Sequence, residues 1–97
     1  MNRNEVISII NSQLLNSEEV KYVSLGAPVT MTSVISLEFT AQGSDFSGTV
    51  NLYSREHEPL TLKAQYDNHS TLIDNESAKK RIDKDVVRIN AYINSLP

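Results

Sequence analysis

Three stretches of alternating sequence decide the fold: ISLEFTA at residues 35–41, FSGTVNLY at 46–53 and LTLKAQY at 60–66. In each stretch every second residue is apolar or small, and most of the residues between them are polar. Successive side chains of a β-strand point to opposite faces, so this period gathers the apolar set on one face. The three stretches therefore predict an antiparallel sheet with one face toward a core and the other toward water.

A fourth strand is expected at residues 20–25, ahead of the other three. The sequence does not decide which side of this strand faces the core, because Val20 and Tyr22 point to one side while Val23 and Leu25 point to the other. The Gly-Ala-Pro sequence that follows ends this strand. Residues 29–32 are then expected to form either a loop or an early start of the next strand.

A helix is predicted at the beginning of the chain, from residue 4 to about residue 17. Val6, Ile10 and Leu14 are spaced four residues apart, which places them on one side of a helix. Ile9 and Leu15 lie off this stripe and widen the apolar arc. Such an arc is typical of a helix that is buried on more than one side or that ends near Leu15, and the alternative is contact with a second copy or a partner.

A longer helix is predicted at residues 74–95, where Asp74 or Asn75 can cap the first turn. Its apolar residues recur in steps of three and four and form one narrow stripe: Ala78, Ile82, Val86, Ile89, Ile93 and Leu96. Asp83 and Asp85 are interpreted as ordinary residues on the flanks of this stripe.

These elements predict a two-layer α+β fold with the order α-β-β-β-β-α. Each helix has an apolar stripe that needs a surface, and the sheet offers one apolar face, so both helices are expected to pack on that face of a four-stranded, mostly antiparallel sheet. The other face would be open to water. With 97 residues and no visible linker or repeat, residues 1–97 are expected to form a single domain.

Composition narrows the setting in which the protein works. The chain has no cysteine, which excludes disulfides, thiolate nucleophiles and cysteine-based metal sites. No signal peptide is visible at its beginning, and no apolar run approaches the ~18 residues of a membrane span. A cytoplasmic protein with no membrane partner is the simplest expectation. The net charge of −3 mildly disfavours non-specific binding of nucleic acid.

The residue combinations that catalysis needs are missing from the sequence. It contains no Gly-x-Ser-x-Gly motif and no glycine-rich phosphate loop, and Gly26, Gly43 and Gly48 are isolated. His57 and His69 fall in predicted connections, where solvated histidines are common. We therefore expect no catalytic, cofactor-binding or metal-binding residues, and the sequence predicts that the protein is not an enzyme.

The candidate partner-binding residues lie on the last predicted helix. Lys80, Lys84 and Arg88 are four residues apart and share the side opposite the apolar stripe, and Val87 and Ala91 fall close to them. Apolar side chains among lysine stems can seat a protein partner. The open sheet face, rich in serine and threonine, is the competing surface.

A small cytoplasmic protein-binding module is the function that these features favour. It would act by docking to another macromolecule, as an inhibitor, immunity or accessory protein, including one encoded by a phage or a mobile element. One alternative is a small-ligand or enzymatic pocket walled by Phe39, Phe46, Tyr66 and Tyr92, with His57 or His69 at its mouth. Others are nucleic-acid binding by the basic helix face and a homodimer formed through the first strand or through Ile9 and Leu15.

Overall fold

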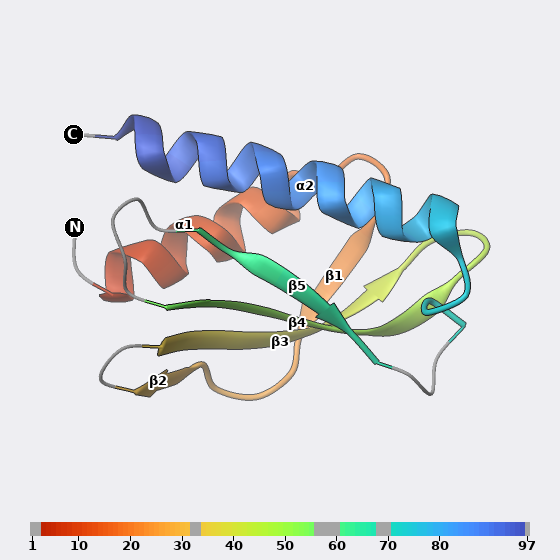
Figure 1. The fold of residues 1–97 in the computed structure, drawn as a ribbon, viewed down its shortest axis with the longest axis horizontal. Coiled ribbons are helices and arrows are strands. Elements are labelled where there is room, and N and C mark those ends of the chain that lie inside the picture. The colour runs from red at the N-terminus through yellow and green to blue at the C-terminus, as the bar shows by residue number, and fades with distance from the viewer. Residues whose placement is uncertain (1–2, 32–33, 56–60, 68–70, 97) are drawn as a thin grey trace.

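A computed structural model describes residues 3–31, 34–55, 61–67 and 71–96 of the chain. In order, these residues form α1 (Arg3–Leu15), β1 (Lys21–Ser24), β2 (Val29–Met31), β3 (Val34–Gln42), β4 (Ser47–Arg55), β5 (Lys63–Tyr66) and α2 (Glu76–Ser95). Figure 1 shows both helices on one side of the sheet, with α2 along the top of the view. The predicted α+β fold is confirmed.

The sheet is ordered β1-β3-β4-β5 and is antiparallel throughout, so the two long strands β3 and β4 lie at its centre. Their register pairs Leu37 with Leu52 and Phe39 with Val50, which places apolar side chains next to one another on the same face. The third predicted strand appears as the shorter β5, and its expected first residue, Leu60, lies outside the described residues.

The segment after β1 departs from the expected loop or early start of β3. Residues 29–31 form the separate short strand β2, which pairs with the beginning of β3 on the same edge that β1 occupies farther along. Gly26 lies between β1 and β2 with φ at 74°, a left-handed conformation that glycine adopts at little steric cost. The chain can therefore bend away from the edge and return to it.

The buried face of the sheet follows the predicted alternation, with these residues inside: Ile35, Leu37, Phe39, Ala41, Val50, Leu52 and Leu62. The ambiguous strand β1 turns Tyr22 inward, whereas Val23 is 52% exposed. The Tyr22 ring packs edge-on against Phe39 with 6.4 Å between the ring centroids. The core-facing side of β1, which the sequence did not decide, is thus the side of Tyr22, where this aromatic contact forms.

Helix α1 closes one part of the core with the predicted residues Val6, Ile10 and Leu14. Ile9 is partly buried against the same core, and Leu15, the last helical residue, is 78% exposed. The helix thus ends at Leu15. This agrees with one of the explanations given for its wide apolar arc, that the helix ends near this residue.

Helix α2 closes the rest of the core. Asn75 is its N-cap, because the side-chain oxygen accepts a hydrogen bond from the Ala78 N–H at 3.0 Å. The predicted stripe is buried at Ala78, Ile82, Val86, Ile89 and Ile93. Asp85 is buried as well, so its interpretation as an ordinary flank residue is wrong.

Candidate protein-binding surface

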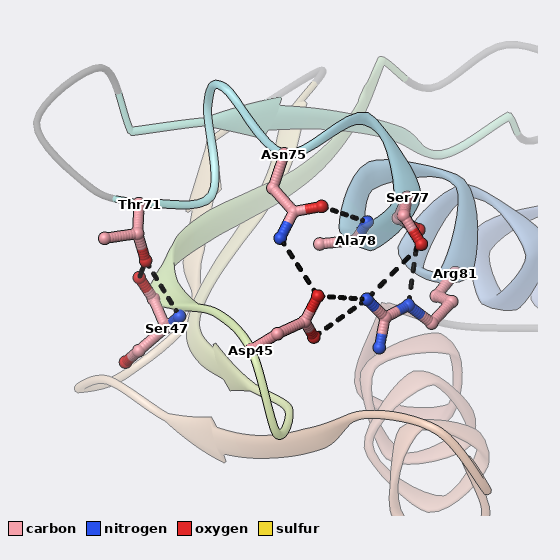
Figure 2. A network of polar contacts seen from close by, with 7 residues as sticks. All are labelled: Asp45, Ser47, Thr71, Asn75, Ser77, Ala78 and Arg81. Atoms are coloured by element: carbon pink, nitrogen blue, oxygen red, sulfur yellow. Dashed lines mark hydrogen bonds and ion pairs between the residues drawn. The ribbon is translucent and has the colours of Figure 1, made fainter.

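Polar contacts hold the first turns of α2 against the turn between β3 and β4 (Figure 2). The Arg81 guanidinium donates to both carboxylate oxygens of Asp45, at 3.0 and 3.2 Å, and lies 5.0 Å from the centroid of the Phe46 ring. Asn75 donates to the same carboxylate at 3.3 Å. The hydrogen bonds from Arg81 and then Asn75 hold the pKa of Asp45 below its usual value.

Ser47 and Gly43, at the two ends of this turn, make further contacts that hold it in place. The Thr71 hydroxyl accepts a hydrogen bond from the Ser47 N–H at 3.1 Å and donates to the Ser47 carbonyl at 3.0 Å (Figure 2). A Cβ atom at Gly43 would overlap the Phe46 ring, so glycine leaves the space that this ring occupies. The β3–β4 turn and the start of α2 are therefore positioned together.

One flank of α2 meets α1 and β1 through a partly buried polar cluster, which we call the Asp85 cluster (Gln13, Ser17, Tyr22, Asp85 and Arg88). The Asp85 carboxylate accepts hydrogen bonds from the Tyr22 hydroxyl and the Ser17 hydroxyl, both at 2.7 Å. Arg88 donates to the Gln13 side-chain oxygen at 2.7 Å and to the Gln13 carbonyl at 2.9 Å, and lies 3.5 Å from Asp85. A buried carboxylate is tolerated when its oxygens are paired in this way.

The spacing of residues on α2 indicates that Asp85 lies close to the buried stripe, although Asp85 was predicted to be an ordinary flank residue. Ala78 and Asp85 are seven residues apart, and at about 100° per residue they point in directions only about 20° apart. Asp85 therefore lies at the edge of the buried stripe. The partners Ser17 and Tyr22 are 68 and 63 residues away in sequence, so nothing in the local pattern names them.

Burial, and then the hydrogen bond to Asp85, raise the pKa of Tyr22 well above its usual value of 10.0. Below pH 10 both the folded and the unfolded chain keep this proton, so the contribution of the Tyr22 hydroxyl to stability is fully present and does not change with pH. Above pH 10 the unfolded chain releases the proton while the folded chain retains it, so the free energy of unfolding should fall as pH rises toward the folded-state pKa.

Urea unfolding at about pH 9 and about pH 11 checks this expectation. Between these two pH values Tyr22→Phe should lose less unfolding free energy than the parent. The variant has no Tyr22 hydroxyl proton for the unfolded chain to release and the folded chain to keep. Tyr66, whose pKa burial and Asp83 also raise, contributes to the fall in both proteins. Equal losses in the parent and the variant would contradict the assignment of the effect to Tyr22.

The other flank of α2 covers the segment that leads into β5. The Asn90 side chain donates to the Leu62 carbonyl at 3.1 Å and accepts from the Leu62 N–H at 2.8 Å. The Tyr66 hydroxyl donates to the Asp83 carboxylate. A side-chain amide that occupies the backbone groups at a sheet edge prevents another strand from pairing there.

These contacts leave one face of α2 turned to solvent, and we call it the outward face (Lys80, Lys84, Val87 and Ala91). All four residues are exposed, and Val87 reaches 67% exposure. Their spacing places them on neighbouring turns of the helix. Arg88, the fifth candidate, is turned away from the outward face because its guanidinium bonds to Gln13.

The five basic residues of α2 do not form one basic stripe. Lys79 pairs with Glu76 at 2.9 Å, Arg81 with Asp45 at 3.0 Å and Arg88 with Asp85 at 3.5 Å. Lys80 and Lys84 form no ion pair within the described ranges. The basic residues of α2 that form no ion pair there are thus Lys80 and Lys84, on the outward face beside Val87.

The competing surface is the open face of the sheet, on the side away from the helices. It contains a shallow hollow of about 410 Å³, lined by Glu38, Thr49, Asn51, Gln65, Tyr66 and Asp67. Apart from Tyr66, whose hydroxyl donates to Asp83 on α2, the described residues of this lining are polar.

The residues proposed to wall a pocket between sheet and helices differ in burial. Phe39 and Phe46 are buried in the core, whereas Tyr92 is 43% exposed. His57 and His69 lie outside the described residues. Among the residues that the structure does describe, no three or more His, Asp or Glu side chains gather in a group that could hold a metal ion.

No helix in the described part of the chain combines the length and the apolar character that crossing a membrane requires. Comparison of the chain with protein-family models, with curated proteins and with solved structures found no match.

Proposed function

We propose that this protein is a small, non-catalytic protein-binding module of the cytoplasm, and that the outward face of α2 contacts an acidic surface of its partner. The observation that carries the proposal is Val87, which is 67% exposed beside Lys84, a lysine with no ion pair among the described residues. An inhibitor, an immunity protein or an accessory factor, including one encoded by a phage or a mobile element, works by docking of this kind.

The outward face has the layout of a small interface. An apolar side chain that becomes desolvated at the centre supplies affinity, and charged side chains around it supply orientation and faster association. The helix that carries it is held by Asp45, by the Asp85 cluster and by the contact between Asn90 and Leu62. Binding would therefore cost little additional ordering of the backbone.

Val87→Asp should weaken partner binding about tenfold or more, because it puts a carboxylate into the apolar centre of the interface. Partners are first captured on the tagged protein from lysate of its source, with and without nuclease, and identified by mass spectrometry. The dissociation constant of the purified partner is then measured for each variant. Recovery that nuclease abolishes would instead indicate nucleic-acid binding.

Leu15→Asp is the matched control, because Leu15 is 78% exposed on a different helix and the substitution makes the same change in charge. Lys84→Glu should weaken binding by a smaller factor that shrinks as salt rises, and Lys21→Glu on β1 serves as its control. A partner that binds Val87→Asp as tightly as Leu15→Asp would rule out the outward face as the binding surface.

A further inference from the structure

Two rows of side chains cross the open face of the sheet from β1 toward β5. Backbone pairing aligns the first row as Leu25, Glu38, Asn51 and Gln65. The second row, aligned in the same way, contains Val23, Thr40, Thr49 and Asp67. Each row thus begins with an apolar residue at the β1 edge and continues with polar residues across the centre.

The apolar ends of the two rows are exposed. Val23 is 52% exposed and Leu25 is 39% exposed, and alternation along β1 puts both on the open face. Val23 and Leu25 therefore form a small apolar contact surface at the β1 edge of the open face.

Most polar residues of the rows line the hollow of about 410 Å³, and two of them, Glu38 and Asp67, carry a carboxylate. The Glu38 carboxylate makes no hydrogen bond or ion pair with any described residue, and it faces the hollow together with the amides of Asn51 and Gln65. The Asn51 side-chain oxygen accepts a hydrogen bond from the Ser36 hydroxyl at 2.8 Å, which orients that amide. Asp67 adds a second carboxylate to the lining, and none of the described residues that line it is basic.

We propose that this hollow receives the guanidinium group of an arginine from a second protein partner, and that an apolar residue beside that arginine rests on Val23 and Leu25. Guanidinium is a planar cation with several N–H donors, so one group can bond to the Glu38 carboxylate and to an amide oxygen together. It is also more weakly hydrated than an ammonium group, which lowers the cost of placing it in a shallow hollow.

This second surface is independent of the outward face of α2. Both helices lie on one side of the sheet (Figure 1), and the residues that line the hollow belong to the other face, so the two surfaces do not overlap. A protein with both surfaces would connect an acidic partner on α2 to an arginine-bearing partner on the sheet.

The test is an NMR titration of the ¹⁵N-labelled full chain with a blocked Val-Arg-Val peptide. Saturable shifts are expected for the backbone amides of Val23, Leu25, Glu38, Asn51 and Gln65. Glu38→Gln should weaken the binding about two- to fivefold, because it removes one exposed charge pair. Glu38 is exposed, so this variant should retain the parent spectrum away from the hollow.

Two controls make the result specific. A peptide with citrulline in place of arginine has nearly the same shape without the charge and should bind as weakly as the arginine peptide binds Glu38→Gln. Glu19→Gln removes an exposed carboxylate outside the hollow and should bind the arginine peptide like the parent.

The proposal is overturned by any of three results: no saturable shift, equal affinity for the two peptides, or unchanged affinity in Glu38→Gln. Val87→Asp should bind the arginine peptide normally. The experiment therefore fails or succeeds separately from the proposed function of α2.

Discussion

Ile89→Ala is expected to lower the free energy of unfolding by about 2–5 kcal/mol. Ile89 is fully buried in the stripe that α2 packs onto the sheet, so truncation removes apolar contacts and leaves a cavity that its neighbours fill only in part. Domains of this kind have a total stability of about 5–15 kcal/mol. The variant should thus lose a large share of its stability.

Urea unfolding followed by circular dichroism measures this loss. Val87→Ala is the matched control, because it shortens a side chain on the same helix at a position that is 67% exposed. Its effect should stay within about 0.5 kcal/mol. If Ile89→Ala were no more destabilising than Val87→Ala, the packing of α2 on the sheet would have to be different.

Asp85→Ala is expected to cost about 2–4 kcal/mol of unfolding free energy. The substitution removes the acceptor of both the Tyr22 hydroxyl and the Ser17 hydroxyl, and it takes the nearby carboxylate from Arg88. Tyr22 is buried, so its O–H would lack a partner away from water, and that loss accounts for most of the cost.

A double-mutant cycle separates the hydrogen bond from the rest of the cluster. Tyr22→Phe alone should cost about 1 kcal/mol. The Tyr22→Phe and Asp85→Ala pair should cost less than the sum of the two single changes, because no phenol O–H is then left unpaired. Asp83→Ala removes the acceptor of the Tyr66 hydroxyl at an exposed site, where water can replace it, and should cost under about 1 kcal/mol. Strict additivity of the two changes would argue against the bond between Tyr22 and Asp85.

Local sequence patterns predicted most of the fold. The alternation around Leu37, Leu52 and Leu62 identified the buried face of the sheet, because a period of two has a direct geometric meaning in a strand. The narrow apolar stripe of α2 likewise identified the side of this helix that is buried against the sheet. The short strand β2 was missed, since three residues carry too little pattern to distinguish a strand from a loop.

The candidate surface was predicted less completely. The outward positions of Lys80, Lys84, Val87 and Ala91 follow from helical geometry alone, and the structure exposes all four. Arg88 satisfies the same four-residue spacing, yet its long side chain reaches Gln13 on α1, a contact between residues 75 positions apart. Periodicity gives the direction in which a side chain leaves its helix, and it does not give the groups that the side chain then meets.

The sequence by itself determined the α+β class, the buried face of the central strands and the stripe by which α2 packs, because each depends on the spacing of apolar residues within one element. Only the tertiary structure decided that β1 turns Tyr22 inward, that Asp85 is buried and that Arg88 leaves the outward face. These outcomes depend on hydrogen bonds between segments far apart in the chain, and such partners are defined only when the helices are packed against the sheet.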